Sequence, residues 1–267
     1  MTTETPMDAR SLKGKVALIT GSSSSVGYRV AEELAGRGAT IALNGRDADA
    51  GQQALKRFED AGHKAIFEAG DASKYDEIAR VVAAVEQRLG GIDILVTSGG
   101  STRPGPTLFH DYKPEDMMKA IEGRVLPRIY PMHAVLPGMR ARSSGAIVLV
   151  ATDAARFPTP GEALIGASGA AVILMTKTLA KEFSRWKIRV NCVALTLTSD
   201  TTRYEENLNK PSHAKAIFSK ALSRFPFGAA PSATEVARVA AFLASNEASQ
   251  VTGQTISVNG GLSFGGW

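Results

Sequence analysis

Short apolar runs alternate with longer amphipathic segments along most of the chain. The runs are rich in Val, Ile and Leu, which is typical of buried β-strands, and the segments between them repeat apolar residues at helical spacing. The expected strands are residues 15–20, 40–45, 65–70, 92–100, 145–151, 188–195 and 254–261. The expected helices are residues 28–38, 49–61, 73–90, 114–141, 162–184 and 232–245. The pattern predicts an α/β fold with a single-domain, Rossmann-type, doubly wound parallel sheet and helices on both faces.

The same pattern suggests one domain. The chain has 267 residues, 44% of them hydrophobic, which suits a single α/β domain of this size. Residues 1–13 are expected to form a flexible tail, and residues 14–267 the domain. Residues 196–227 are the longest stretch without a strand, so this substrate-loop region is expected to form a binding loop or lid.

Composition and charge restrict the function further. The net charge is +5, but 31 Lys and Arg are scattered among 26 Asp and Glu, so no nucleic-acid partner is expected. The single cysteine, Cys192, lies in an apolar run, which leaves no disulfide framework and no cysteine-based metal site. We expect no metal, and we find no secretory signal and no apolar run of about 18 residues. A cytoplasmic protein without membrane contact is therefore expected.

A glycine-containing turn, "TGSSSSVGY" (Thr20–Tyr28), lies between the first strand and the first helix. This context is the one in which backbone N–H groups and a helix N-terminus bind a pyrophosphate. The turn resembles Thr-Gly-x-x-x-Gly-x-Gly of the short-chain dehydrogenase/reductase family. Thr20, Gly21 and Gly27 match it, and Ser25 stands at the middle glycine, where a side chain would crowd the phosphates.

The resemblance extends over nearly the whole chain. Asp71 stands where the family has its adenine-contacting Asp, and "VTSGG", which includes Gly99, replaces the family's Asn-Asn-Ala-Gly. "GQTISVNGG" resembles the last strand, with Asn259 for the usual Asp. The resemblance implies cofactor-binding positions at Thr20, Gly21, Ser25, Gly27, Arg46, Asp71 and Gly99, weak or vestigial.

The end of the second strand bears on the choice of cofactor. An NAD site would carry an acid there for the ribose 2′-hydroxyl, but the chain has Asn44, with Arg46 nearby. Arg46 facing a 2′-phosphate would favour NADP, whereas a solvent-facing Arg46 would have no such role. The sequence therefore predicts either no cofactor or weak NADP(H) binding.

The catalytic set implied by the resemblance is a Tyr, a Lys one helical turn later, a Ser and an Asn. Counting from "MTKTLAKEF", "GAIVLVAT" and "LPGM" places Ile165 at the Tyr, Gly169 at the Lys, Thr152 at the Ser and Arg124 at the Asn. No residue of 154–176 is Tyr, Lys or His. Of the four degenerate positions, only Thr152 keeps its functional group, so no catalytic residue is expected.

Two hypotheses of function follow. The first is a pseudoenzyme that is not catalytic alone. It would be a structural or regulatory subunit that forms homo-oligomers or, with an active paralogue of the family, hetero-oligomers (dimer or tetramer). The alternative is an NADP(H)-binding oxidoreductase, or a non-redox enzyme, with catalysis relocated to Arg124, Thr152 and Asp153. In that case, Arg124 would be charge-compensated in a cleft by Asp153 or Glu162.

Overall fold

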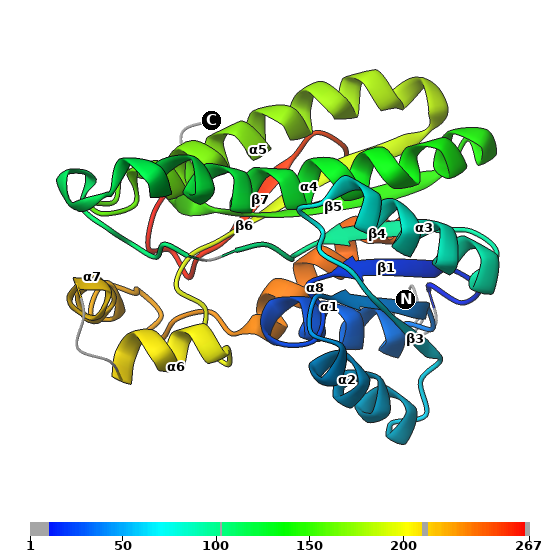
Figure 1. The fold of residues 1–267 in the computed structure, drawn as a ribbon, viewed down its shortest axis with the longest axis horizontal. Helices are drawn as coiled ribbons and strands as arrows, with labels where there is room; N and C mark the ends of the chain where they lie inside the picture. The colour runs from blue at the N-terminus through cyan, green and yellow to red at the C-terminus, as the bar shows by residue number, and fades with distance from the viewer. Residues whose placement is uncertain (1–10, 102, 210–212, 265–267) are drawn as a thin grey trace, which may run out of the picture.

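The computed structural model describes residues 11–101, 103–209 and 213–264 (Figure 1). Seven strands form one parallel sheet in the order β3-β2-β1-β4-β5-β6-β7. They are β1 (Val16–Thr20), β2 (Thr40–Gly45), β3 (Ala65–Ala69), β4 (Ile94–Thr97), β5 (Gly145–Thr152), β6 (Ile188–Leu195) and β7 (Thr255–Val258). This architecture confirms the predicted Rossmann-type fold.

Eight α-helices in the described residues surround the sheet. They are α1 (Ser25–Gly36), α2 (Ala48–Asp60), α3 (Tyr75–Leu89), α4 (Pro114–Arg142), α5 (Ala163–Phe183), α6 (Thr202–Asn209), α7 (His213–Leu222) and α8 (Ala233–Ala244). Helices α1, α2 and α8 pack on one face, and α3, α4 and α5 on the other (Figure 1). Helices α6 and α7 lie to one side of the sheet (Figure 1).

The side chains of β1 point alternately into two hydrophobic cores, one on each face of the sheet. Ala17 and Ile19 are buried against α1 and α8, whereas Val16 and Leu18 are buried against α3, α4 and α5. Successive side chains of a strand point to opposite faces, so a strand covered on both sides must be apolar throughout. This requirement explains the continuous apolar runs in the sequence.

Some boundaries differ from the sequence-based expectation. Residues 1–10 of the expected tail lie outside the described residues, but Leu12 is 2% exposed and belongs to the core, so the domain begins earlier than residue 14. Helix α1 begins at Ser25 rather than at Tyr28. The expected loop 196–227 contains α6 and α7.

One helical segment, Ala163–Trp186, is long and apolar enough by length and composition to cross a membrane, contrary to the expectation from the sequence. The core helix of a soluble protein passes the same test, and α5 packs on the sheet and on α4 with Val172 and Ile173 buried. Helix α5 therefore packs on the sheet with one face, while 39% of its apolar window is buried. One apolar side chain stays outside this packing, since Leu174 is 62% exposed.

Candidate active site

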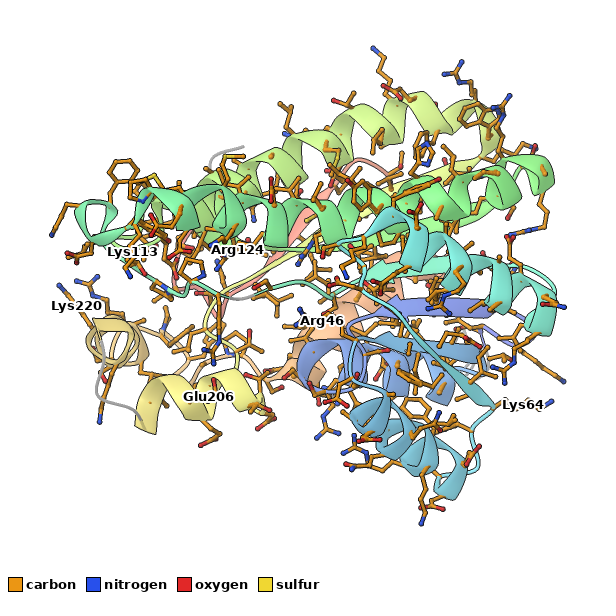
Figure 2. The ribbon with its side chains drawn as sticks, in the orientation of Figure 1. Arg46, Lys64, Lys113, Arg124, Glu206 and Lys220 are labelled. Carbon is orange, nitrogen blue, oxygen red and sulfur yellow. The ribbon has the colours of Figure 1, made fainter. Side chains whose placement is uncertain are left out.

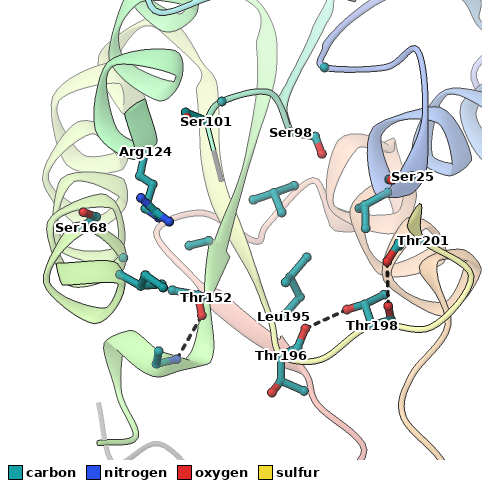
Figure 3. Close-up of a pocket in the computed structure, with 18 of the residues that line it drawn as sticks. Ser25, Ser98, Ser101, Arg124, Thr152, Ser168, Leu195, Thr196, Thr198 and Thr201 are labelled. Carbon is teal, nitrogen blue, oxygen red and sulfur yellow. Dashed lines mark hydrogen bonds between the residues drawn. The ribbon is translucent and has the colours of Figure 1, made fainter. Parts of the chain in front are cut away.

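A cavity of about 1160 Å³ lies at the carboxyl ends of the strands, where the strand order reverses between β1 and β4. This switch point is where open α/β sheets bind their ligands. The lining comes from the turn after β1, from the ends of β2, β4, β5 and β6, and from α4, α5 and the 196–227 segment (Figure 3). The cavity volume lies just above the roughly 300–1,000 Å³ of pockets that hold one small ligand, so an extended ligand fits.

The turn between β1 and α1 requires glycine at two of the predicted positions. A Cβ on Gly21, whose φ is +66°, would lie 2.3 Å from Cα of Gly99. A Cβ on Gly27 would lie 2.3 Å from the carbonyl oxygen of Gly21. Gly21, Gly27 and Gly99 all line the cavity. Thr20 is fully buried instead, and its hydroxyl accepts a hydrogen bond from the Gly99 N–H at 3.4 Å.

The N-terminus of α1 is open toward the cavity. Ser25, its first residue, has φ +54°, the left-handed conformation that glycine favours, and it lines the cavity (Figure 3). The N-cap, Ser24, makes no side-chain capping hydrogen bond, and the first turn holds no acidic residue. Unsatisfied N–H groups and the positive end of the helix dipole make this end of α1 suitable for an anion.

The end of β2 carries no acid for a ribose. Asn44 is 1% exposed, and its amide donates hydrogen bonds to the carbonyl oxygens of Glu68 (3.0 Å) and Gly70 (3.1 Å). Asn44 therefore ties β2 to the end of β3. Its Oδ1 is buried without a hydrogen-bond partner in the described residues, at the cavity wall.

Arg46 and Asp71 are two charged residues that line the cavity near the end of β2. Arg46 is exposed and lines the cavity (Figure 2). Burial acts to raise the pKa of Asp71, but two hydrogen bonds from Ser73 and the positive charge of Arg46 outweigh it, and the pKa lies below its ordinary value. Asp71 is thus ionised at neutral pH.

Ile165 and Gly169, which stand at the implied Tyr and Lys positions, both line the cavity. Gly169 is buried, and a Cβ there would meet Cγ2 of Thr152 at 2.7 Å and Cβ of Ala155 at 3.0 Å. The space in which a longer side chain would begin is therefore filled. The turn Asp153–Ala155 packs directly on α5.

Arg124 enters the cavity from α4 (Figure 3). Its guanidinium donates to the carbonyl oxygens of Ala120 at 2.7 Å and Pro104 at 2.6 Å. These bonds hold the guanidinium at the cavity wall.

Arg128, one turn later on α4, is a second cation in the wall. It donates to the carbonyl oxygens of Gly99 (2.7 Å) and Val150 (3.0 and 3.2 Å), and no carboxylate in the described residues pairs with it. Burial lowers the pKa of Arg128 to about 10, opposed by Cys192 and assisted by Arg124, so it remains charged at neutral pH.

Glu162 adds a titratable carboxyl group to the cavity wall, and Thr152 adds a hydroxyl group. Glu162 lines the cavity just before α5, three residues ahead of Ile165. Burial raises the pKa of Glu162, and the positive Arg124 acts against this shift. The Thr152 hydroxyl accepts a hydrogen bond from the Ala154 N–H at 3.2 Å and keeps its own hydrogen free to donate.

Asp153 has a different role from the catalytic one considered from the sequence. Its Oδ1 accepts from Arg156 (3.0 Å) and Ser257 (2.6 Å), and its Oδ2 accepts from Asn259 (2.5 Å). Asp153 is 5% exposed. Its carboxylate is therefore occupied in joining the end of β5 to β7 and the segment after it. Asn259, which replaces an acid of the resembled family, donates to this carboxylate.

Several residues of the site were missed in the sequence. Arg128 could have been found, because it follows Arg124 by four residues on one helix face. Lys220 and Arg224 line the far end of the cavity from α7 and the turn after it. No sequence signal marks them, because their position depends on how the 196–227 segment folds back.

Comparison with known proteins extends the fold to a family. The model of the family described as enoyl-(acyl carrier protein) reductase matches residues 21–263. The chain is 37% identical over 251 residues to 3-oxoacyl-(acyl-carrier-protein) reductase FabG of Thermotoga maritima, covering 94% of this chain and 98% of the relative. It is 33% identical over 263 residues to a tropinone reductase homolog of Arabidopsis thaliana, covering 98% and 83%.

A solved structure, a gluconate 5-dehydrogenase from Burkholderia cenocepacia in complex with NADP and tartrate, has a TM-score of 0.86 at 28% identity. The match covers 96% of this chain and 97% of that one. These relatives are named as reductases and a dehydrogenase, and one holds NADP. They contradict the hypothesis of a pseudoenzyme. That hypothesis rested chiefly on Ile165 and Gly169, and the named activities of these relatives overturn it.

Proposed function

Because this chain belongs to the short-chain dehydrogenase/reductase family, we propose that it is an NADP(H)-dependent oxidoreductase that interconverts a carbonyl compound and an alcohol. One observation carries the proposal: a single cavity joins Arg46 and the glycine turn to Arg124, Thr152 and Glu162. A cofactor site at one end thus opens directly onto polar groups suited to carbonyl chemistry at the other.

The residues at the α1 end fit NADP(H). Gly21 and Gly27 leave the backbone free for a close approach, and the uncapped N-terminus of α1 suits a pyrophosphate. Arg46 supplies a positive charge for a 2′-phosphate, and the absence of an acid at Asn44 removes the usual preference for NAD. Bound NADPH would supply the hydride.

The chain's own residues would orient the carbonyl and supply its proton. The Thr152 hydroxyl donates a hydrogen bond to the carbonyl oxygen, and Arg124 stabilises the negative charge that develops on it. Glu162 retains its proton to higher pH than an exposed glutamate, so it can act as general acid. In this proposal the family's Tyr and Lys are absent, and Glu162 with Arg124 replaces them.

The proposal is tested by carbonyl-dependent NADPH oxidation with the purified chain alone. Glu162→Gln should lower kcat by about 10²- to 10⁴-fold, the usual contribution of a general acid. Glu182→Gln is the matched control, since Glu182 is exposed on the same helix, and it should leave the rate unchanged. A wild-type rate retained by Glu162→Gln would contradict the assignment.

We also propose that two copies associate through α4 and α5. The two helices pack side by side on the sheet, and less than half (39%) of the most apolar window of Ala163–Trp186 is buried. Leu174 is 62% exposed there. A second copy would cover this apolar strip, as obligate interfaces do.

A further inference from the structure

Four cations besides Arg46 line the cavity. Arg124 and Arg128 come from α4, Lys220 from α7, and Arg224 from the turn after α7. Lys220 and Arg224 are exposed, and neither pairs with a carboxylate in the described part of the chain. In the view of Figure 2, Arg124 lies between Lys220 on α7 and Arg46.

Among the described residues, the acids that line the cavity form no ion pair with Lys220 or Arg224. Asp153 is bound by Arg156, Ser257 and Asn259, so its charge is already compensated. Glu162 is another acid in the lining. Burial raises the pKa of Glu162, which favours its neutral form. Lys220 and Arg224 therefore keep their positive charge for a ligand, and a cleft lined by one sign of charge concentrates ligands of the opposite sign.

The two groups of cations differ in what they can do. Arg124 and Arg128 are fixed by backbone carbonyls close to the polar groups of the reaction site. Lys220 and Arg224 are exposed at the far wall, where they can reach a charged group distant from the reacting carbon. A guanidinium binds a carboxylate or phosphate in bidentate geometry, so both chemistries suit this wall.

We infer that the substrate is a small anion whose carboxylate or phosphate group is bound by Lys220 and Arg224 while its carbonyl lies between Arg124 and Thr152. The inference rests on the proposed function for the identity of the reacting group. The anion site itself depends only on the cations. Neutral ketones and alcohols of the same size would bind more weakly, since they leave these charges without a counterion.

Calorimetric titration compares D-gluconate with D-glucitol, which differ at one carboxylate, and with inorganic phosphate, each with and without NADP. The better of the two anions should bind at least about tenfold more tightly than D-glucitol, and added salt should weaken it. In the double variant Lys220→Gln, Arg224→Gln its Kd should rise about tenfold. Lys64→Gln, a charge removed far from the cavity (Figure 2), should leave it unchanged.

The outcomes separate the two claims. Equal binding of both anions and D-glucitol, or an unchanged Kd in the double variant, overturns the anion site. Charge-dependent anion binding with no NADP binding overturns the proposed oxidoreductase and leaves the anion site standing. A preference for gluconate over phosphate assigns a carboxylate, and the reverse assigns a phosphate.

Discussion

A Cβ placed on Gly169 would lie 2.7 Å from Cγ2 of Thr152, so these two residues share one space in the cavity wall. Thr152 is β-branched and its side chain is held by the hydrogen bond from the Ala154 N–H. The side chain of Thr152 thus occupies the space beside Gly169, the position at which the resemblance implies a lysine.

Gly169→Ala should therefore destabilise the protein by about 1–3 kcal/mol, the usual result of overpacking. The control is Gly36→Ala in α1, where an added Cβ meets nothing within 4 Å. That variant should gain about 0.5–1 kcal/mol from helix propensity. Chemical denaturation measures the free energy of unfolding of both variants. A stabilised Gly169→Ala variant would show that the side chains around residue 169 move easily to make room for a methyl group.

Asp153→Ala should cost about 3–5 kcal/mol of unfolding free energy, because it leaves the buried Arg156 without its carboxylate. Asp116→Ala removes an exposed pair with Lys119 and should cost less than about 1 kcal/mol. Thermal denaturation compares the two. Similar small losses would mean that Asp153 does not join β5 to β7.

The rate of carbonyl reduction should fall as pH rises through the raised pKa of Glu162, because a general acid must hold its proton. Stability has the same sign: the fold disfavours ionised Glu162, so stability is lost as pH rises from the unfolded to the folded pKa. Glu162→Gln should remove both dependences. A pH–rate profile with the same falling limb in wild type and variant would contradict this.

Arg46→Gln should raise the Kd for NADPH about tenfold and leave that for NADH nearly unchanged, because only NADPH carries the 2′-phosphate. Fluorescence titration with each nucleotide measures the ratio, and Lys64→Gln is the charge-matched control. An equal effect on both nucleotides would assign Arg46 a non-specific role.

Leu174→Asp should convert the oligomer to a monomer, because an exposed apolar residue of α5 would become a charge inside the proposed interface. Analytical ultracentrifugation gives the mass. Lys64→Asp, an exposed change outside α4 and α5, separates an added negative charge in general from this position. A monomeric wild type would end the proposal.

The sequence predicted the fold well because its signals are local. Apolar runs buried on both faces, such as β5, and glycine-terminated helices determine the order of elements. The glycine turn could also be predicted from the sequence. A side chain at Gly21 or Gly27 would collide with backbone atoms, and this holds in any protein of this architecture.

The reaction site was less predictable because it is assembled from distant segments. The positions of Arg124 and Thr152 could be counted along the chain, but their surroundings could not. Asp153 and Glu162 looked alike in sequence, and only burial and partners separate the carboxylate that joins β5 to β7 from the one with a raised pKa. Lys220 reaches the cavity through the fold of the 196–227 segment.

Isotope transfer shows whether this chain alone catalyses hydride transfer. The purified chain is incubated with NADPH deuterated at the transferable position and a panel of anionic and neutral ketones, and products are analysed by mass spectrometry. Deuterium should appear in an alcohol formed from an anionic ketone, and its amount should be greatly reduced in Glu162→Gln. Tight NADPH binding with no deuterium in any product would contradict the proposed activity.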